Sequence, residues 1–296
     1  MQKIYFIIQC LIIFSVSFHE ILLSQEVEIT SEGEIRSFKI NLPDDIDEPL
    51  PIIILMHGLG ETNSNMYGVA NYFSNRSFIA VRPQSGSYLN SSGSGYTTLW
   101  NALADTQKFD DVKFISDVID YMLLNYDFVD HDRIYATGFS NGAYLSFELA
   151  CKLSNKIAAF ASVAGHMFID TYNDCSPTHP TPFLSINGTE DNYQGIASYY
   201  LSVDDSNNYW NIFNSTDTEP IITDIDDINT SDGSTVKYYS WKNGSNGVEV
   251  DHYKVIGGGH SWPSSGGDNK GWDNGDIDTN VLIWNFFSKF DINGLR

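Results

Sequence analysis

Residues 133–153, RIYATGFSNGAYLSFELACKL, form the stretch that decides the fold. RIYAT predicts a short buried strand, GFSNG a sharp turn, and the apolar residues from Ala143 onward recur at helical spacing. Between a strand and a helix, the pattern G-x-S-x-G holds its serine in a strained backbone conformation, and its glycines remove Cβ atoms that would collide with the adjoining elements. We therefore expect the hydroxyl of Ser140 to stand exposed at a helix start as a nucleophile. The alternative is a glycine-rich connection between strand and helix that has no catalytic role.

Short apolar runs alternate with helical patterns on both sides of this stretch. Such alternation predicts an α/β fold, a mostly parallel sheet with helices on both faces, whose functional groups gather at the carboxyl ends of the strands. A long polar surface loop near the pocket is expected over residues 84–98. The predicted strands cover 51–56, 78–81, 133–137, 158–163, 182–186, 235–241 and 248–256, the predicted helices 110–126, 204–213 and 278–290, and an antiparallel hairpin 27–42.

The N-terminus has the proportions of a secretory signal peptide. Lys3 precedes an apolar run from Ile4 to Phe18 that is short for a membrane span, and a small-residue cleavage point lies near Ser24. We expect a signal peptide over 1–24 and one catalytic domain over 25–296, since 296 residues with 42% hydrophobic residues suit a single core. An uncleaved anchor is the alternative. The mature chain is expected to be secreted, extracellular or periplasmic, without stable membrane insertion.

The chain is strongly acidic. Sixteen basic residues stand against 38 acidic ones, a formal net charge of −22 at pH 7. A field of this sign repels nucleic acid and anionic membrane surfaces, so neither is expected as a partner.

Two cysteines remain once residues 1–24 are removed. Export favours a disulfide between Cys151, near the end of the helix that follows Ser140, and Cys175, in a loop before a later strand. Two free thiols are the alternative.

A nucleophilic serine needs a base, and seven histidines compete for that role. His260 is preferred because it follows a predicted strand and the run Gly257–Gly259, which can bring the backbone close to a neighbouring element. A structural loop histidine is the alternative reading of His260. The others lie in the signal peptide, in a turn, inside a strand pattern, in the tight turn after 51–56, or in a loop that suits polar or substrate-contacting residues: His19, His131, His252, His57, and His166 with His179.

The base needs an orienting carboxylate, expected at a strand end between serine and histidine. Asp191, just past the strand over 182–186, meets this demand. Glu190 is the near competitor, and a solvated loop carboxylate is the alternative for both.

The tetrahedral intermediate of acyl transfer needs two preorganised N–H donors. The backbone N–H of Asn141, directly after the nucleophile, supplies one. The turn after strand 51–56 has glycines that permit tight backbone, and the N–H of Leu59 is the expected second donor.

Three aromatic residues are candidates for the substrate pocket: Trp262 beside the base, Trp100 and Tyr96. Core packing is the alternative for each. The acidic residues near the C-terminus do not follow the order of a calcium-binding EF-hand loop, so neither a metal nor a cofactor is expected. These residues are Asp268, Asp273, Asp276 and Asp278.

Several motifs together resemble the secreted polyhydroxybutyrate depolymerase and feruloyl or acetylxylan esterase group of the α/β-hydrolase superfamily. The likeness runs from about residue 34 to 290, and its most specific element is GGGHSWP. It implies Ser140 as nucleophile, Asp191 as acid, His260 as base, and a bridge from Cys151 to Cys175. Relatives often have histidine before the Gly-Thr of the acid loop, where this chain has Asn187. The motifs are MHG at 56–58, GFSNGA at 138–143, AC at 150–151, SVAG at 162–165, GTED at 188–191 and GGGHSWP at 257–263.

The function expected from the sequence is ester hydrolysis through an acyl-enzyme. Feruloyl or acetyl esters of plant polysaccharide are the first substrate class, and polyhydroxyalkanoate or another polyester is the alternative. A binding module that keeps the fold without catalysis predicts no reaction with a serine-directed probe. A peptidase would need a specificity pocket for which the sequence gives no sign.

Overall fold

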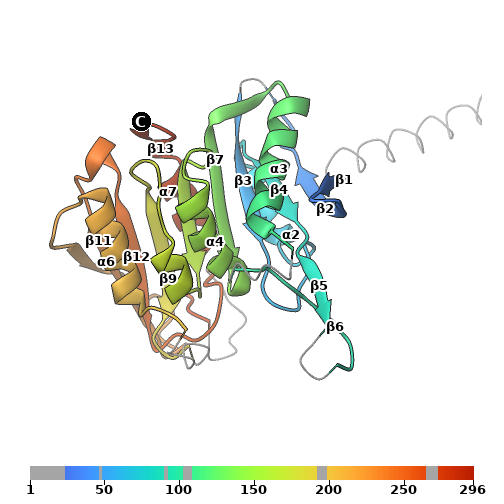
Figure 1. Ribbon diagram of the computed structural model, residues 1–296. Coiled ribbons are helices and arrows are strands. Elements are labelled where there is room, and N and C mark those ends of the chain that lie inside the picture. The colour runs from blue at the N-terminus through green and yellow to red at the C-terminus, as the bar shows by residue number, and fades with distance from the viewer. Residues whose placement is uncertain (1–23, 47–48, 90–92, 103–108, 192–198, 265–272) are drawn as a thin grey trace, which may run out of the picture.

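The computed structural model describes residues 24–46, 49–89, 93–102, 109–191, 199–264 and 273–296. A ten-stranded sheet organises the molecule (Figure 1), in the order β1-β2-β4-β3-β7-β8-β9-β12-β11-β10. Its centre is parallel, as predicted, from β4 across to β12, with one shift of register between β3 and β7 at Leu50 and Ile52. These central strands are β4 (Ile79–Pro83), β3 (Leu50–Met56), β7 (Val129–Phe139), β8 (Ala159–Val163), β9 (Phe183–Gly188) and β12 (Val250–Ile256).

Antiparallel strands flank the parallel centre. The predicted hairpin over 27–42 is confirmed as β1 (Gln25–Ser31) and β2 (Glu34–Asn41), and β2 pairs with β4. At the other edge β11 (Thr235–Trp241) pairs with β12, and β10 (Ile221–Asp224) pairs with β11. The exposed strand β10 has no alternating pattern and was not predicted.

Helices cover both faces because the central strands are apolar on both sides. Along β3, Ile52 and Ile54 face one core cluster while Ile53 and Leu55 face the other, and all four are fully buried. The first face is covered by α3 (Asp111–Asn125), α4 (Asn141–Lys152) and α6 (Val203–Asn214), and the second by α2 (Tyr67–Ser74) and α7 (Thr279–Phe287). A short helix, α5 (Ile169–Asn173), follows β8, and a small hairpin of β13 (Phe290–Asp291) and β14 (Gly294–Leu295) ends the chain.

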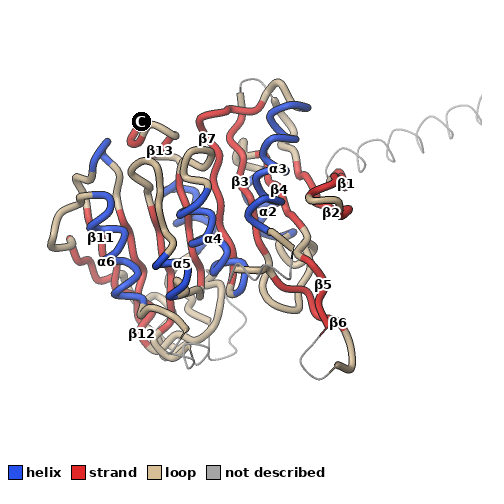
Figure 2. Tube along the Cα trace, viewed as in Figure 1, coloured by secondary structure: helices blue, strands red, loops and turns tan. Residues whose placement is uncertain are grey.

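Residues 84–98 are not simply the long loop expected from their polarity. They contain an antiparallel ribbon of β5 (Gly86–Leu89) and β6 (Tyr96–Leu99), which projects beyond the main sheet (Figure 2). Its glycines and serines hide the strand propensity of the Tyr-Thr-Thr-Leu segment. The ribbon is anchored at its base, where the N–H of Gly60 donates to the carbonyl of Thr98 at 2.8 Å.

The predicted signal peptide lies outside the described residues except for Ser24. Within the described ranges, no helix has the length and apolar composition of a membrane span.

A disulfide joins Cys151 at the end of α4 to Cys175 in the loop that leads to β9. The bond closes a loop with a sequence separation of 24 residues. We expect the double substitution Cys151→Ala with Cys175→Ala to lower the free energy of unfolding by about 3 kcal/mol, because the cross-link restricts the unfolded chain. Urea denaturation measures this loss. Ester turnover should be unchanged at 25 °C, and an equally stable double variant would contradict the expectation.

Candidate active site

Ser140 occupies a strained turn between β7 and α4. Its backbone angles are φ 54° and ψ −116°, a conformation that L-residues rarely adopt. The turn is held because the N–H of Ser140 donates to the carbonyl of Val163 at 3.0 Å, while its own carbonyl accepts the N–H of Tyr144 at 3.0 Å. The hydroxyl is thereby presented at the first turn of α4, as the sequence pattern predicts.

The glycines on either side of Ser140 permit this turn. A Cβ on Gly138 would lie 2.3 Å from the carbonyl carbon of Gly142, and a Cβ on Gly142 would lie 2.3 Å from the carbonyl oxygen of Met56. Neither position can accept a side chain without a backbone shift. The elbow is therefore packed directly against the end of β3.

Three polar side chains meet at the carboxyl ends of the parallel strands. His260 Nε2 lies 2.8 Å from Ser140 Oγ, and His260 Nδ1 lies 2.8 Å from Asp191 Oδ2. The carboxylate side chain is 1% exposed and the imidazole is 17% exposed. With the Nδ1 proton donated to the carboxylate, Nε2 is free to accept the serine proton. The structure thus brings together the three residues that the sequence selects.

The acid competitor Glu190 is not the carboxylate that is bonded to His260. Its side chain is exposed, and only its backbone N–H takes part, donating to the carbonyl of Gly258 at 2.9 Å. Asp191 is the carboxylate that reaches His260.

The loops that carry acid and base are bonded to each other. The N–H of Thr189 donates to Val255 O at 2.9 Å, and the N–H of Gly257 donates to Thr189 Oγ1 at 2.9 Å. A Cβ on Gly188 would lie 2.2 Å from the carbonyl oxygen of Gly258. This close approach explains why position 188 needs glycine, and it fixes Asp191 relative to His260.

Two backbone N–H groups near the serine are candidates for the oxyanion hole. In the described part of the chain, the N–H groups of Leu59 and Asn141 have no hydrogen-bond partner. The neighbouring N–H of Gly58 is already bound to Glu61 Oε2 at 2.8 Å, which leaves Leu59 as the available donor of this turn. His57 Nδ1 lies 2.9 Å from the carbonyl of Gly58 and fixes the turn from the inside.

Trp100 takes a different place from the predicted substrate contact. Its side chain is 1% exposed, and the indole N–H donates to the carbonyl of His57 at 2.9 Å. Its backbone N–H donates to Asn141 Oδ1 at 2.6 Å, and Asn141 Nδ2 donates back to its carbonyl at 3.2 Å. Trp100 therefore connects the turn that holds Leu59 to the start of α4. The sequence could not predict this role because it does not show which aromatic side chains are buried.

We expect Trp100→Phe to lower kcat on 4-nitrophenyl acetate about tenfold, because it removes the hydrogen bond to the His57 carbonyl and loosens the turn that holds a candidate oxyanion donor. KM should change less than kcat. Trp210→Phe is the matched control, since the buried indole N–H of Trp210 on α6 has no partner in the described structure. Equal kcat values for the two variants would contradict this role.

The other two aromatic candidates lie at the surface or beside α7. Tyr96 is 75% exposed on β6. Trp262 is half-buried, packs against the core cluster beneath α7, and donates its indole N–H to Asn280 Oδ1 at 3.1 Å. The sequence analysis missed an aromatic residue beside the base: the ring centroid of Phe139 is 5.1 Å from that of His260. Its position directly before Ser140 was the available signal.

The acidic residues near the C-terminus mostly support loops. Asp276 Oδ1 accepts the N–H groups of Ile228 and Asn229, both at 2.9 Å, and Asp278 caps α7. Asp268 lies outside the described residues. Over the described ranges, no group of three or more His, Cys, Asp and Glu residues is placed to hold a metal ion.

Three further histidines are buried, and burial lowers their pKa. His57, His166 and His252 all lose solvation in the fold, and the pKa of His252 falls to about 4. They are therefore neutral at pH 7. His166 has the closest relation to the site because the charges of Asp191 and His260 both act on it.

His252 should make stability pH-dependent. Its pKa is about 4 in the fold against 6.5 for a solvated histidine, so between these pH values the unfolded chain binds more protons. Its contribution is complete above pH 6.5 and is lost as the pH falls to 4, about 3 kcal/mol in all. Urea denaturation at pH 7 and pH 4 should show a larger loss for the wild type than for His252→Gln. The same loss in both proteins would contradict this assignment.

Comparison with known proteins gives a consistent picture. Residues 40–220 match the phospholipase/carboxylesterase family. A bifunctional acetylxylan esterase/xylanase of Neocallimastix patriciarum is 26% identical over 272 residues, 89% of this chain and 34% of that protein. Feruloyl esterase B of Piromyces equi is 29% identical over 187 residues, 59% of this chain and 32% of that protein. The chain thus spans about a third of the length of these two relatives.

Two further likenesses complete the comparison. Poly(3-hydroxyalkanoate) depolymerase C of Paucimonas lemoignei is 25% identical over 264 residues, 79% of this chain and 60% of that protein. The solved structure of acetyl xylan esterase from Aspergillus awamori superposes with a TM-score of 0.59 at 14% identity, covering 84% of this chain and 98% of that one. The latter likeness shows the shared fold.

Proposed function

The chain belongs to the phospholipase/carboxylesterase family, and on this premise we propose that it is a serine carboxylic ester hydrolase. The observation that carries the proposal is the single imidazole of His260, which lies 2.8 Å from Ser140 Oγ on one side and 2.8 Å from Asp191 Oδ2 on the other. This is the arrangement that turns an alcohol into a nucleophile.

Acylation follows from these contacts. His260 Nε2 takes the proton of Ser140 as Oγ attacks the ester carbonyl carbon, and Asp191 stabilises the imidazolium that forms. The negative charge on the carbonyl oxygen is then met by the N–H groups of Asn141 and Leu59. When the tetrahedral intermediate collapses, His260 returns the proton to the leaving alcohol oxygen, and the acyl group stays on Ser140.

Deacylation uses the same residues, with water as the nucleophile and Ser140 as the leaving group. His260 takes a proton from water, the resulting hydroxide attacks the acyl carbon, and Ser140 Oγ leaves with that proton. The partly exposed imidazole can contact solvent water, while the buried Asp191 carboxylate keeps its orientation through both steps.

We propose acetyl or feruloyl esters of plant polysaccharide as the substrate class. The support is the likeness to an acetylxylan esterase/xylanase and to a feruloyl esterase, together with a fold shared with an acetyl xylan esterase. A polyester is the second candidate because a poly(3-hydroxyalkanoate) depolymerase aligns with 79% of the chain.

Product analysis separates the two candidates. Purified protein is incubated with acetylated xylan, with feruloylated xylan and with a poly(3-hydroxybutyrate) film, and released acetate, ferulate and hydroxybutyrate are measured by chromatography. We expect acetate or ferulate from the polysaccharides. Release of hydroxybutyrate alone would assign the protein to the polyester class.

We also propose that residues 1–24 direct export and that 25–296 form the catalytic domain. N-terminal sequencing of protein recovered from the medium or periplasm of a secreting host should begin near residue 25. Retention of the intact N-terminus in a membrane fraction would favour an anchor instead.

A further inference from the structure

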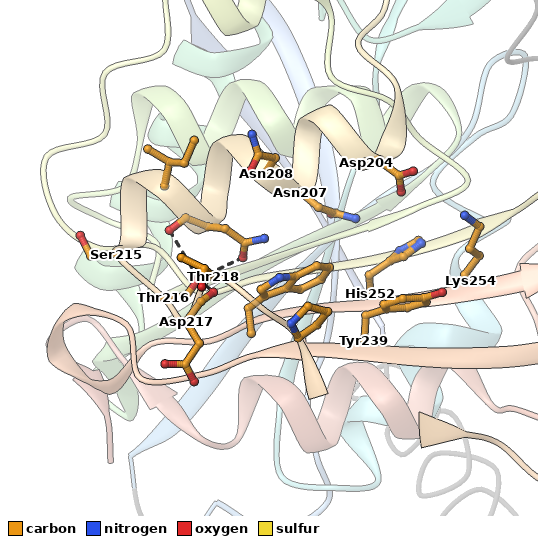
Figure 3. A pocket seen from close by; sticks show the side chains of 14 residues that line it. Asp204, Asn207, Asn208, Ser215, Thr216, Asp217, Thr218, Tyr239, His252 and Lys254 are labelled. Atoms are coloured by element: carbon orange, nitrogen blue, oxygen red, sulfur yellow. Dashed lines mark hydrogen bonds between the residues drawn. The ribbon is translucent and has the colours of Figure 1, made fainter. Parts of the chain in front are cut away.

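A groove runs between α6 and the strands β11 and β12, and its lining includes neither Ser140 nor His260. It consists of two adjoining cavities of about 510 and 530 Å³. Both are lined by Asp204, His252 and Lys254, so they share one wall. We call this combined hollow the α6 groove. Figure 3 shows its first half, with Asn207 and Asn208 of α6 on one side and Tyr239 and His252 on the other.

The strand side of the α6 groove is an aromatic surface. Tyr239 and Trp241 are two residues apart on β11 and thus lie on the same face of the sheet. Their rings are 6.1 Å apart and inclined by only 19°, and the ring of His252 on the paired strand lies 5.9 Å from that of Tyr239. Both Tyr239 and Trp241 are only partly buried, so their faces are accessible from the groove.

Hydrogen bonds between α6 and the neighbouring strands fix the polar groups of the groove. The buried hydroxyl of Ser185 donates to Asn207 Oδ1 at 2.9 Å and lies 2.9 Å from His252 Nδ1. Because that hydroxyl proton is used on Asn207, His252 must donate from Nδ1, which leaves its Nε2 as an acceptor. Over the described residues, neither His252 Nε2, Asn207 Nδ2 nor the amide of Asn208 has a partner.

The charges in the groove favour an uncharged ligand. The carboxylates of Asp204 and Asp217 are exposed along it, and Lys254 is the basic residue of its lining. The burial that lowers the pKa of His252 to about 4 keeps this ring neutral at working pH. With Asp205 of the second cavity, an anion would meet three carboxylates in a chain whose formal net charge is −22.

We propose that the α6 groove binds a neutral saccharide chain. A pyranose ring has an apolar C–H face that can lie on Tyr239 and Trp241, and a rim of hydroxyls that can both donate and accept. The amides of Asn207 and Asn208 and the acceptor Nε2 of His252 match that rim. The two aromatic rings and His252 Nε2 thus lie on the strand side of the groove, and the amides of Asn207 and Asn208 face them from α6.

The groove also leads toward the proposed catalytic site. Its second cavity is lined by Gly188 and Thr189, which precede Asp191 in the acid loop. A chain held on the aromatic surface would extend toward the carboxyl ends of β9 and β12, where Asp191 and His260 lie. Delivery of a polymer-borne ester to Ser140 rests on the proposed function, whereas saccharide binding itself does not.

Calorimetric titration of the Ser140→Ala protein with unsubstituted xylohexaose and cellohexaose tests binding without any ester. We expect at least one oligosaccharide to bind, and Tyr239→Ala in the same background to weaken it about tenfold. Asn208→Ala, which removes an exposed and unpartnered amide, should weaken binding about threefold without affecting the fold. Tyr67→Ala is the matched control, because it removes an exposed ring from α2 at the other end of the sheet.

Activity then separates this proposal from the previous one. In the Ser140-containing protein, Tyr239→Ala should leave turnover of 4-nitrophenyl acetate unchanged and reduce acetate release from acetylated xylan. Absence of binding to both oligosaccharides at millimolar concentration, or binding that survives Tyr239→Ala and Asn208→Ala, would overturn the proposal whether or not the protein is an esterase. Loss of esterase activity in Ser140→Ala with oligosaccharide binding intact supports both.

Discussion

Ser140→Ala is expected to lower kcat on short nitrophenyl esters roughly 10⁶-fold while the fold persists. The change removes only the Oγ atom that lies 2.8 Å from His260 Nε2 and leaves every backbone contact of the turn in place. Steady-state kinetics with 4-nitrophenyl acetate measures the loss, and circular dichroism checks the fold. Turnover within a factor of about ten of the wild type would remove Ser140 from the mechanism.

Comparing Ser140→Gly with Ser140→Ala measures the backbone strain at this position separately from the loss of the hydroxyl. Both substitutions remove the hydroxyl, but only glycine relaxes a residue held at φ 54° and ψ −116°. We expect Ser140→Gly to be about 1 kcal/mol more stable than Ser140→Ala, and both to be inactive. Urea denaturation of the two variants makes the comparison. A less stable glycine variant would mean that the turn carries no strain.

Gly188→Ala is the second substitution with a large expected effect. The added Cβ would lie 2.2 Å from the carbonyl oxygen of Gly258 and 2.5 Å from that of Gly259, so the acid and base loops must separate. We expect the free energy of unfolding to fall by about 2 kcal/mol and kcat to fall about 100-fold, because a small displacement of Asp191 from His260 misaligns the base.

Gly68→Ala controls for the general cost of adding a methyl group to a glycine. Gly68 lies in α2, and a Cβ there meets no atom within 4 Å. Alanine favours a helix over glycine, so this variant should be as stable as the wild type or more stable, with unchanged kcat. If Gly188→Ala behaved like Gly68→Ala, the contact between the two loops would not position the acid.

The sequence predicted the central strands and the meeting of Ser140, Asp191 and His260 for a simple reason. Strands buried on both faces are short apolar runs, and the residue that follows each run lies at the same edge of a parallel sheet. The G-x-S-x-G turn marks the end of one such strand, and the glycines before His260 mark the end of another. The local sequence was sufficient to predict the structure wherever the backbone accepts only one residue type, as at the glycines of these two turns.

Features set by tertiary contacts were less visible. Trp100 directly follows the polar stretch over 84–98 and was expected to line the substrate pocket, but its indole is buried and donates to the His57 carbonyl. Tyr239 and Trp241 share one face of β11 because they are two residues apart, but the groove above them exists only because α6, distant in sequence, packs beside them. Neither relation has a period or motif along the chain, so it becomes visible only after the chain has folded.

Covalent labelling tests the central claim most directly. Native protein is treated with a fluorophosphonate probe, digested, and mapped by mass spectrometry. The geometry predicts a single modification on the hydroxyl of Ser140, absent in Ser140→Ala and strongly reduced in His260→Ala, because the probe reacts only with a serine that a neighbouring base activates. A folded protein that takes up no probe, or takes it up at another residue, would contradict the claim that Ser140 is the nucleophile.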